Sequence, residues 1–263
     1  MFFDYFQMND NPFAENPPVE WLLFDQRFDQ AMARLKFFRD QGMFALVTGQ
    51  TGLGKTSLLR LFKKELPQNR FQHLFLHMTN VNANAFLRMI VTQLGEKPKM
   101  GKDRQFYQII ARLKDNETDT ILIIDEAHLL PSQALTDLRL LIGSGLDQKL
   151  PLKVLLTGQD PLLKLLKRNQ HADLFGRISV QYHIRSLNKL QTRAYIDHRL
   201  KCAGASDKIF DSEAKELIHD YSGGIPRLIN NIAIAGLIDA ASKNLKQVSA
   251  QLVNQVMAEF RLP

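Results

Sequence analysis

The feature that most constrains this sequence is the stretch from Gly49 to Thr56, which fits the pattern G-x-x-x-x-G-K-[ST]. It follows the apolar run Phe44–Val47 and precedes a helix-like run that begins at Ser57. Glycines permit backbone conformations and close approaches that a Cβ hinders, so several N–H groups can converge on phosphate oxygens. The pattern therefore predicts a phosphate-binding loop between a strand and a helix.

Each residue type in this loop has an expected task in binding ATP. The helix that follows directs its N-terminal amides and its dipole toward an anion. The Lys55 ammonium is expected to reach the β- and γ-phosphates, and the Thr56 hydroxyl to bind Mg²⁺. The alternative is a glycine-rich turn that binds nothing, and the residues downstream argue against it. The expected nucleotide-binding residues of the loop are Gly49, Gln50, Thr51, Gly52, Leu53, Gly54, Lys55, Thr56 and Ser57.

Apolar runs of strand length alternate with helical patterns in the first two thirds of the chain. Unbroken apolar residues such as Ile121–Ile124 suit a strand that is covered on both faces of a parallel sheet. Helices are expected from Phe24 to Arg39 and from Asp160, an N-cap followed by Pro161. The alternation predicts an α/β fold with a doubly wound parallel sheet. The expected strands are 44–47, 71–77, 120–124 and 153–157.

The pattern changes at Asn188, after which apolar residues recur only at helical spacing. This predicts a small all-helical domain at residues 188–263, after a nucleotide-binding domain at 23–187. Residues 1–22, rich in Phe, Asn and Pro, are expected to form an extended tail that packs on the core.

Two acidic residues, Asp125 and Glu126, stand at the end of an apolar run. An acid pair there is common by itself, but after a phosphate-binding loop it is the second half of a nucleotide-hydrolysing site. Asp125 is expected to hold the Mg²⁺ shell, and Glu126 to orient and deprotonate the attacking water.

Composition indicates which partners, metal sites and cellular location to expect. The 34 Lys and Arg residues against 27 Asp and Glu give a net charge of +7, which fits a polyanionic partner and equally a solvated basic surface. Cys202 is the single cysteine, and His128 and the other histidines lack zinc-ligand spacing, so we expect structural roles for them. No apolar run approaches the roughly 18 residues of a membrane helix, and no signal peptide is evident, so a cytoplasmic protein without membrane insertion is expected.

Three motifs in sequence order resemble those of an AAA+ ATPase: the loop, Ile121–Glu126 and Gly223–Arg227. Within that class the chain is similar to the ExeA/GspA-like group. The stretches that carry this similarity are Phe6–Phe13, Asp125–Pro131 and Tyr221–Asn230. The resemblance covers essentially the whole chain and implies a P-loop AAA+ module followed by a helical lid.

The resemblance implies roles for further residues. Thr157 matches the sensor-1 position beside the γ-phosphate, with a strand-end Thr that satisfies a backbone group as the alternative. Arg177 resembles the finger that reaches a neighbouring subunit's nucleotide, although Arg168 competes for that role and Arg177 could be structural. Arg227, after Pro226 at the start of a lid helix, matches sensor 2.

ExeA/GspA secretion ATPases add a membrane helix and a periplasmic part, whereas we expect a free-standing module here. Such modules are similar to the TnsC, TniB and MuB type, which assemble on duplex DNA with ATP and recruit or activate a transposase. A homo-oligomer, ring or helical filament, is implied. The alternatives are a secretion-associated ATPase acting through a separate membrane partner, or a nucleotide-gated adaptor with little turnover.

A basic segment supplies the candidate DNA contacts: Lys97, Lys99, Lys102 and Arg104. Pro98 and Gly101 predict that this segment is a loop rather than a helix. A protein that coats duplex DNA without choosing sequence needs phosphate contacts from such residues. The loop could equally be a solvated connector.

Overall fold

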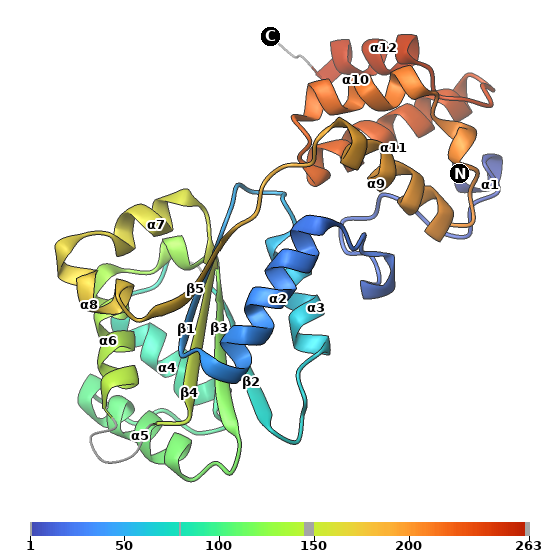
Figure 1. The fold of residues 1–263 in the computed structure, drawn as a ribbon. Coiled ribbons are helices and arrows are strands. Elements are labelled where there is room, and N and C mark those ends of the chain that lie inside the picture. Colours follow the sequence, from blue (N-terminus) through green and yellow to red (C-terminus); the bar gives the residue numbers. More distant parts are fainter. Residues whose placement is uncertain (1, 79, 145–149, 261–263) are drawn as a thin grey trace. The chain divides into compact units, whose positions relative to one another are not determined.

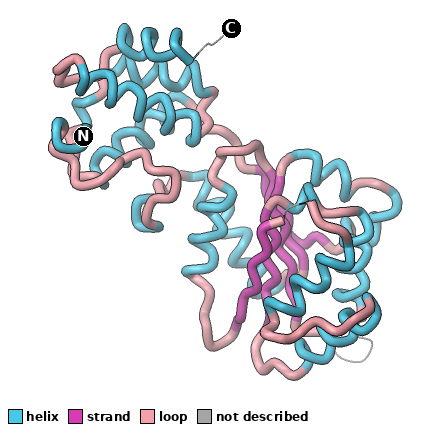
Figure 2. The backbone as a smooth tube through the Cα atoms, turned by 180° about the vertical axis from the view of Figure 1, so that it is seen from behind, coloured by secondary structure: helices cyan, strands magenta, loops and turns pink. Residues whose placement is uncertain are grey.

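The computed structural model describes residues 2–78, 80–144 and 150–260, apart from the side chain of Phe260. These residues form two compact units, traced in Figures 1 and 2. The unit that contains the sheet, called the sheet unit, comprises Phe28–Thr51 and Leu58–Ile184. The helical unit comprises Met1–Arg27, Gly52–Ser57 and Arg185–Pro263.

The sheet unit contains one five-stranded sheet in the order β2-β3-β4-β1-β5, and all its strand pairs are parallel. This confirms the predicted α/β fold with a parallel sheet, and the four predicted strands are present. A fifth strand at the edge, β5, was not predicted. The strands are β1 (Phe44–Thr48), β2 (Phe71–His77), β3 (Asp119–Asp125), β4 (Leu152–Gly158) and β5 (Ile178–His183).

Both faces of the central strands are covered, which explains their unbroken apolar runs. On one face, residues such as Leu46 and Leu122 join the side chains of α4, α5 and α6 in a single core. On the other, Phe38 of α2 and Phe62 of α3 place their ring centroids 6.4 Å apart. Figure 1 shows α2 and α3 on the side of the sheet opposite α4 to α6.

The helices of the sheet unit correct two expectations. The N-cap of α7 is Gln159, one residue earlier than predicted, and Asp160 lies in the first turn, next to the proline. Helix α5 begins at Lys102, directly after its N-cap Gly101, so the basic segment is only partly a loop. The helices are α2 (Gln26–Gln41), α3 (Lys55–Lys64), α4 (Ala83–Gln93), α5 (Lys102–Lys114), η2 (Ala127–Leu129), α6 (Ser132–Gly143), α7 (Asp160–Leu166), η3 (Asn169–His171) and α8 (Ala172–Phe175).

The helical unit has a core of its own, built around Phe210, Ile218, Ile229 and Leu237. The N-terminal segment, which was expected to be extended, contains helix α1 and the short helix η1. The elements of this unit are α1 (Phe2–Tyr5), η1 (Val19–Trp21), α9 (Lys189–Cys202), η4 (Asp207–Ile209), α10 (Ser212–Ser222), α11 (Pro226–Ser242) and α12 (Ala250–Phe260).

The N-terminal segment is fastened to α9 by a buried arginine. Arg199 is 2% exposed and donates to the backbone oxygens of Pro12, at 2.5 Å, and Ala14, at 3.0 Å. Its guanidinium also donates to the hydroxyl of Tyr195, 3.1 Å away. Close by in sequence, Phe13 packs edge-on against Phe210, with 6.1 Å between ring centroids. The segment is therefore part of the fold of this unit.

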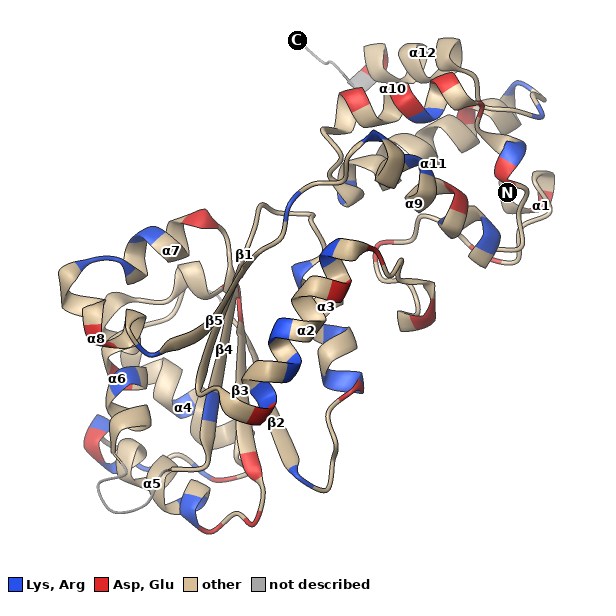
Figure 3. Cartoon of the chain, viewed as in Figure 1, with Lys and Arg blue, Asp and Glu red and all other residues tan. Residues whose placement is uncertain are grey.

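Charge is spread over both units. Figure 3 shows Lys and Arg interspersed with Asp and Glu on most helices. Among the described residues, no helix combines the length and the apolar character that crossing a bilayer requires.

Candidate nucleotide site

The predicted phosphate-binding loop lies between β1 and α3. Gly52 and Gly54 have φ angles of +82° and +96°, a region that L side chains rarely adopt, which explains why glycine stands at both positions. Lys55 is the first residue of α3 and is 4% exposed. The loop thus delivers a lysine to the N-terminal end of a helix, where backbone N–H groups have no helical acceptor and attract an anion.

Within the helical unit, Gly52 and Arg227 are in direct contact. The Arg227 N–H donates to the Gly52 oxygen over 3.3 Å. A Cβ built on Gly52 would lie 2.8 Å from the Arg227 Cβ and 3.0 Å from Ile225 Cγ2. The guanidinium of Arg227 lies 3.3 Å from the Glu15 carboxylate, and both side chains are more than half exposed. The predicted sensor-2 arginine is therefore at the phosphate-binding loop.

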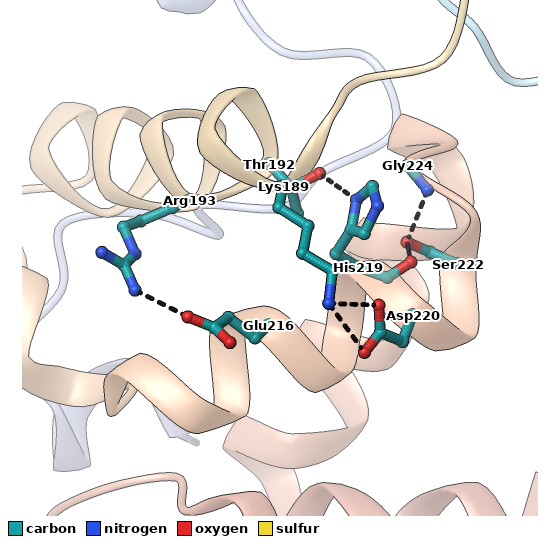
Figure 4. Close-up of polar contacts among 8 residues, drawn as sticks. All are labelled: Lys189, Thr192, Arg193, Glu216, His219, Asp220, Ser222 and Gly224. Carbon is teal, nitrogen blue, oxygen red and sulfur yellow. Dashed lines mark hydrogen bonds and ion pairs between the residues drawn. The ribbon is translucent and has the colours of Figure 1, made fainter.

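The turn before Arg227 is held by polar contacts between α9 and α10, drawn in Figure 4. Ser222 accepts from the Gly224 N–H at 3.2 Å and donates to the His219 oxygen at 3.3 Å. Gly224 has φ +71°, and a Cβ there would meet the Leu187 oxygen at 1.9 Å, so only glycine fits. The contacts between the helices are Lys189 with Asp220 at 3.0 Å, Thr192 with His219 at 2.9 Å and Arg193 with Glu216 at 3.2 Å.

In the sheet unit, Asp125 ends β3 with its side chain fully buried. Its Oδ1 accepts from the Thr157 hydroxyl at 2.5 Å and from the Glu126 N–H at 3.0 Å. Its Oδ2 lies 3.6 Å from His77 Nδ1. The structure thus brings Thr157, predicted as sensor 1, into contact with the predicted metal ligand.

Glu126 follows Asp125 in a left-handed conformation, with φ 52° and ψ 35°. Its Oε2 lies 3.2 Å from Nδ1 of His128 in η2, and the two side chains are 24% and 14% exposed. From the sequence, only a structural role is expected for this histidine. The signal that could have found it is its spacing from Glu126, close enough for a tight turn to return the ring to the carboxylate.

Thr56 and the carboxylate of Asp125 are the predicted Mg²⁺ ligands. Both provide oxygen donors, which suit a hard divalent cation. Among the described residues, no cluster of three or more His, Cys, Asp or Glu side chains is arranged to hold a metal ion by itself. That Thr56 and Asp125 bind Mg²⁺ stays a prediction.

The two finger candidates lie on the segment between α7 and β5. Arg168 is the N-cap of η3, and Arg177 stands between α8 and β5. Both side chains are exposed, so either can reach a second molecule. Which of them acts in trans stays a prediction.

The four basic DNA candidates have different surroundings. Lys97 and Lys99 are exposed on the connection between α4 and α5, and Arg104 is exposed on α5. Lys102, in contrast, lies 2.7 Å from the buried carboxylate of Asp137. Removing its charge would leave a buried anion without that partner, so Lys102 has a structural task.

Residues 39–166 match the protein family described as "AAA domain". The chain carries an AAA domain. The predicted resemblance to AAA+ ATPases is thereby confirmed, and the family assignment supports ATPase activity.

The AAA domain has named relatives of two kinds. The chain is 31% identical over 255 residues to General secretion pathway protein A of Aeromonas hydrophila, covering 94% of this chain and 46% of that protein. It is 25% identical over 170 residues to the Mu-like prophage FluMu DNA transposition protein B of Haemophilus influenzae, covering 63% of this chain and 56% of that protein. The chain spans about half the length of these curated relatives.

Solved structures share the fold of the chain. Cdc6p from Pyrobaculum aerophilum superimposes with a TM-score of 0.73 at 17% identity, covering 95% of this chain and 70% of that one. At this identity the likeness shows the fold alone, and it agrees with the predicted P-loop AAA+ module.

Proposed function

We propose that this protein binds ATP with Mg²⁺, assembles as a homo-oligomer on duplex DNA in the cytoplasm, hydrolyses the nucleotide, and recruits or activates a transposase. The observation that supports the DNA and transposase roles is its similarity to a relative that is named a DNA transposition protein. The net charge of +7 agrees with a polyanionic partner.

The nucleotide chemistry follows from the residues of the loop and of the β3 end. The loop amides and the Lys55 ammonium bind the phosphates, and Arg227 adds a second cation at the loop. Glu126 accepts the proton of the attacking water. When bound, Mg²⁺ neutralises phosphate charge, with Thr56 and Asp125 as its protein ligands. Arg177 or Arg168 supplies a cation to the nucleotide of a neighbouring subunit.

A second candidate function is favoured by a different observation. The higher identity, 31% over 255 residues, is to a protein named for general secretion. An AAA ATPase of that kind would act through a separate membrane partner, without a need for DNA. Duplex-dependent assembly separates the two candidates.

The decisive experiment measures fluorescence anisotropy of labelled duplexes of unrelated sequence with and without ATP, together with negative-stain images. ATP-stimulated binding to every duplex, with rings or filaments that require DNA, is the expected result. Absence of ATP-stimulated duplex binding at low salt would contradict the DNA role and favour the secretion candidate. ATP binding without measurable turnover would favour a nucleotide-gated adaptor.

The exposed basic residues of the α4–α5 region provide a sharper version of the test. Replacing Lys97, Lys99 and Arg104 by Gln is expected to flatten the log–log salt slope by up to about three units and to weaken all duplexes similarly. Replacing the exposed Lys201, Lys208 and Lys246 by Gln removes the same charge from the helical unit. If the two triple variants change duplex affinity and salt slope equally, the effect comes from net charge alone. Such a result would contradict a DNA-binding surface in the α4–α5 region.

A further inference from the structure

The turn that follows β3 places a histidine against the predicted catalytic carboxylate. Glu126 has left-handed backbone angles, and the Leu129 N–H donates to the Glu126 oxygen at 2.9 Å, closing the turn. A non-glycine residue in this region is strained by about 1 kcal/mol or more, so the surrounding structure must hold it. The result is that the Glu126 side chain and the ring of His128 face each other within one turn.

The two facing atoms are buried, and each is the other's neighbour at an ion-pair distance. Glu126 Oε2 and His128 Nδ1 lie 3.2 Å apart. Both are shielded from solvent, and in the described part of the chain neither has a hydrogen-bond partner of good geometry. A buried polar atom without a partner is costly, by about 1–3 kcal/mol. A small rotation of the ring that aims an Nδ1 proton at Oε2 removes this cost for both atoms.

Gln159, which follows β4, determines where that proton sits. Its Nε2 lies 3.3 Å from His128 Nε2. An amide nitrogen can only donate, so Nε2 of the ring accepts and the ring proton is assigned to Nδ1, where it points at Glu126. The amide therefore fixes the tautomer that serves the carboxylate.

Gly158 makes room for this arrangement. A Cβ on Gly158 would lie 3.2 Å from the His128 nitrogen and 3.5 Å from the Ala127 nitrogen. It would also lie 3.0 Å from Leu162 Cδ2, so a side chain at this position would crowd Leu162 and the backbone of η2. The close approach keeps the ring within reach of Gln159.

We infer that His128 is a positioning residue for Glu126: its Nδ1–H holds Oε2, so that the other carboxylate oxygen, Oε1, is directed at the attacking water. Gln159, which follows β4, holds the His128 ring through Nε2. The two contacts, Gln159 to His128 and His128 to Glu126, together fix the orientation of the Glu126 carboxylate. The inference rests on the proposed ATPase role of Glu126. A residue that acts only by orienting Glu126 affects turnover and leaves ATP binding unchanged.

The kinetic test compares variants that differ in one hydrogen bond. His128→Leu removes both ring nitrogens and is expected to lower kcat by about 10- to 100-fold, with the ATP dissociation constant unchanged. His128→Asn places an amide N–H near the Nδ1 position and is expected to restore most of kcat. Leu129→Ala, which alters an exposed residue of the same turn, is the matched control and is expected to behave as wild type. If His128→Leu does not fold, Gln159→Leu tests the same contacts, because it removes the amide that holds the His128 ring. A smaller loss of kcat is expected for it.

Two results would overturn the inference: wild-type kcat in His128→Leu, or a loss in His128→Asn as large as in His128→Leu. A readout independent of turnover comes from the ¹⁵N chemical shifts of the imidazole, which report which ring nitrogen carries the proton. The expected tautomer carries its proton on Nδ1, and a proton on Nε2 would contradict the assignment. A wild-type protein without turnover but with the Nδ1–H tautomer would count against the proposed ATPase function and leave the geometry of the pair intact.

Discussion

Thr157 donates its hydroxyl to Oδ1 of Asp125 over 2.5 Å, and both side chains are fully buried at the ends of neighbouring strands. The bond joins the residue predicted to sense the γ-phosphate to the one predicted to hold the cation. The bond holds Oδ1 of the carboxylate, and the other oxygen, Oδ2, lies 3.6 Å from His77 Nδ1. The alternative considered from the sequence, a strand-end Thr that satisfies a backbone group, does not describe this contact.

Replacing Thr157 by Val tests how much the hydrogen bond to Asp125 contributes to the stability of the fold. Val keeps the shape but removes the donor, so we expect a loss of about 1–3 kcal/mol in unfolding free energy and lower turnover. Urea denaturation measures the former. The control Thr92→Val removes an exposed hydroxyl that donates within α4, and a change within about 0.5 kcal/mol is expected. Equal losses in the two variants would contradict a special role for the Thr157 hydroxyl.

Substitution of Gly52 tests its contact with Arg227, which lies within the helical unit. Gly52→Ala must adopt φ +82° and place a methyl group 2.8 Å from the Arg227 Cβ. Gly95→Ala is a matched control, because its φ is +81° and nothing lies within 4 Å of the added methyl group. Both variants are expected to lose about 1 kcal/mol from backbone strain, and only Gly52→Ala should also weaken ATP binding. Equal ATP affinities, measured by titration calorimetry, would show that the Arg227 contact is dispensable.

Substitutions in the phosphate-binding loop and at the end of β3 should have different effects on ATP binding and ATP hydrolysis. Lys55→Ala removes the ammonium that holds the phosphates, and we expect ATP binding to be lost. Glu126→Gln keeps the size and removes only the base, so binding persists while turnover falls. Phosphate release and nucleotide titration measure the two quantities. Turnover equal to wild type in Glu126→Gln would exclude the role assigned to Glu126.

Subunit mixing identifies the trans-acting arginine. If Arg177 completes the neighbour's site, Arg177→Ala should bind ATP normally but lose turnover. Mixing it with Lys55→Ala should restore part of the activity, because some interfaces then join an intact finger to an intact loop. Arg168→Ala, mixed in the same way, is the comparison. Co-assembled mixtures that never regain activity would rule out a finger at the substituted position.

The pH dependence of stability should carry a contribution from His171. Burial lowers the pKa of this ring below its ordinary 6.5, and the nearby Arg168 lowers it further. The unfolded chain therefore takes up the proton at higher pH than the folded one, so stability falls as pH drops from about 6.5 toward the lower folded pKa. His171→Gln keeps an amide near Ser132, which lies 2.8 Å from Nε2, and removes the titration. Its unfolding free energy should be flatter than that of wild type below about pH 6.5. Parallel curves would contradict the shift.

The central strands and the loop could be predicted from sequence because local and long-range requirements agree there. The edge strand β5 was missed because its burial alternates, with exposed Ser179 and Gln181 between less exposed residues, and this polar pattern resembles a loop. Helix α9 lacks an apolar stripe, since its buried face includes Thr192 and Arg199. Those polar residues are buried only because partners distant in sequence satisfy them, and a local pattern does not encode such partners.

The loop and the acid pair of the candidate site were predicted from motif and position, whereas the supporting contacts were not. Gly101 was interpreted as a helix breaker, but it is the N-cap of α5, which puts Lys102 on a helix and against Asp137. His128 lacks zinc-ligand spacing, which is why the sequence predicts only a structural role for it. The spacing of His128 from Glu126 allows the contact but does not predict it, because the contact depends on the left-handed conformation of Glu126, which a residue with a Cβ rarely adopts.

Arg199 of α9 binds the backbone oxygens of Pro12 and Ala14. The N-terminal segment is therefore comparable to a peptide ligand that is covalently linked to the protein that binds it. A tether keeps such a ligand at an effective concentration of the order of millimolar. Cutting the chain after this segment would turn an intramolecular contact into a bimolecular one. A synthetic peptide of residues 2–18 would then be needed to complete the helical unit. The peptide concentration that gives half-maximal refolding would measure how strongly the N-terminal segment binds to the rest of this unit.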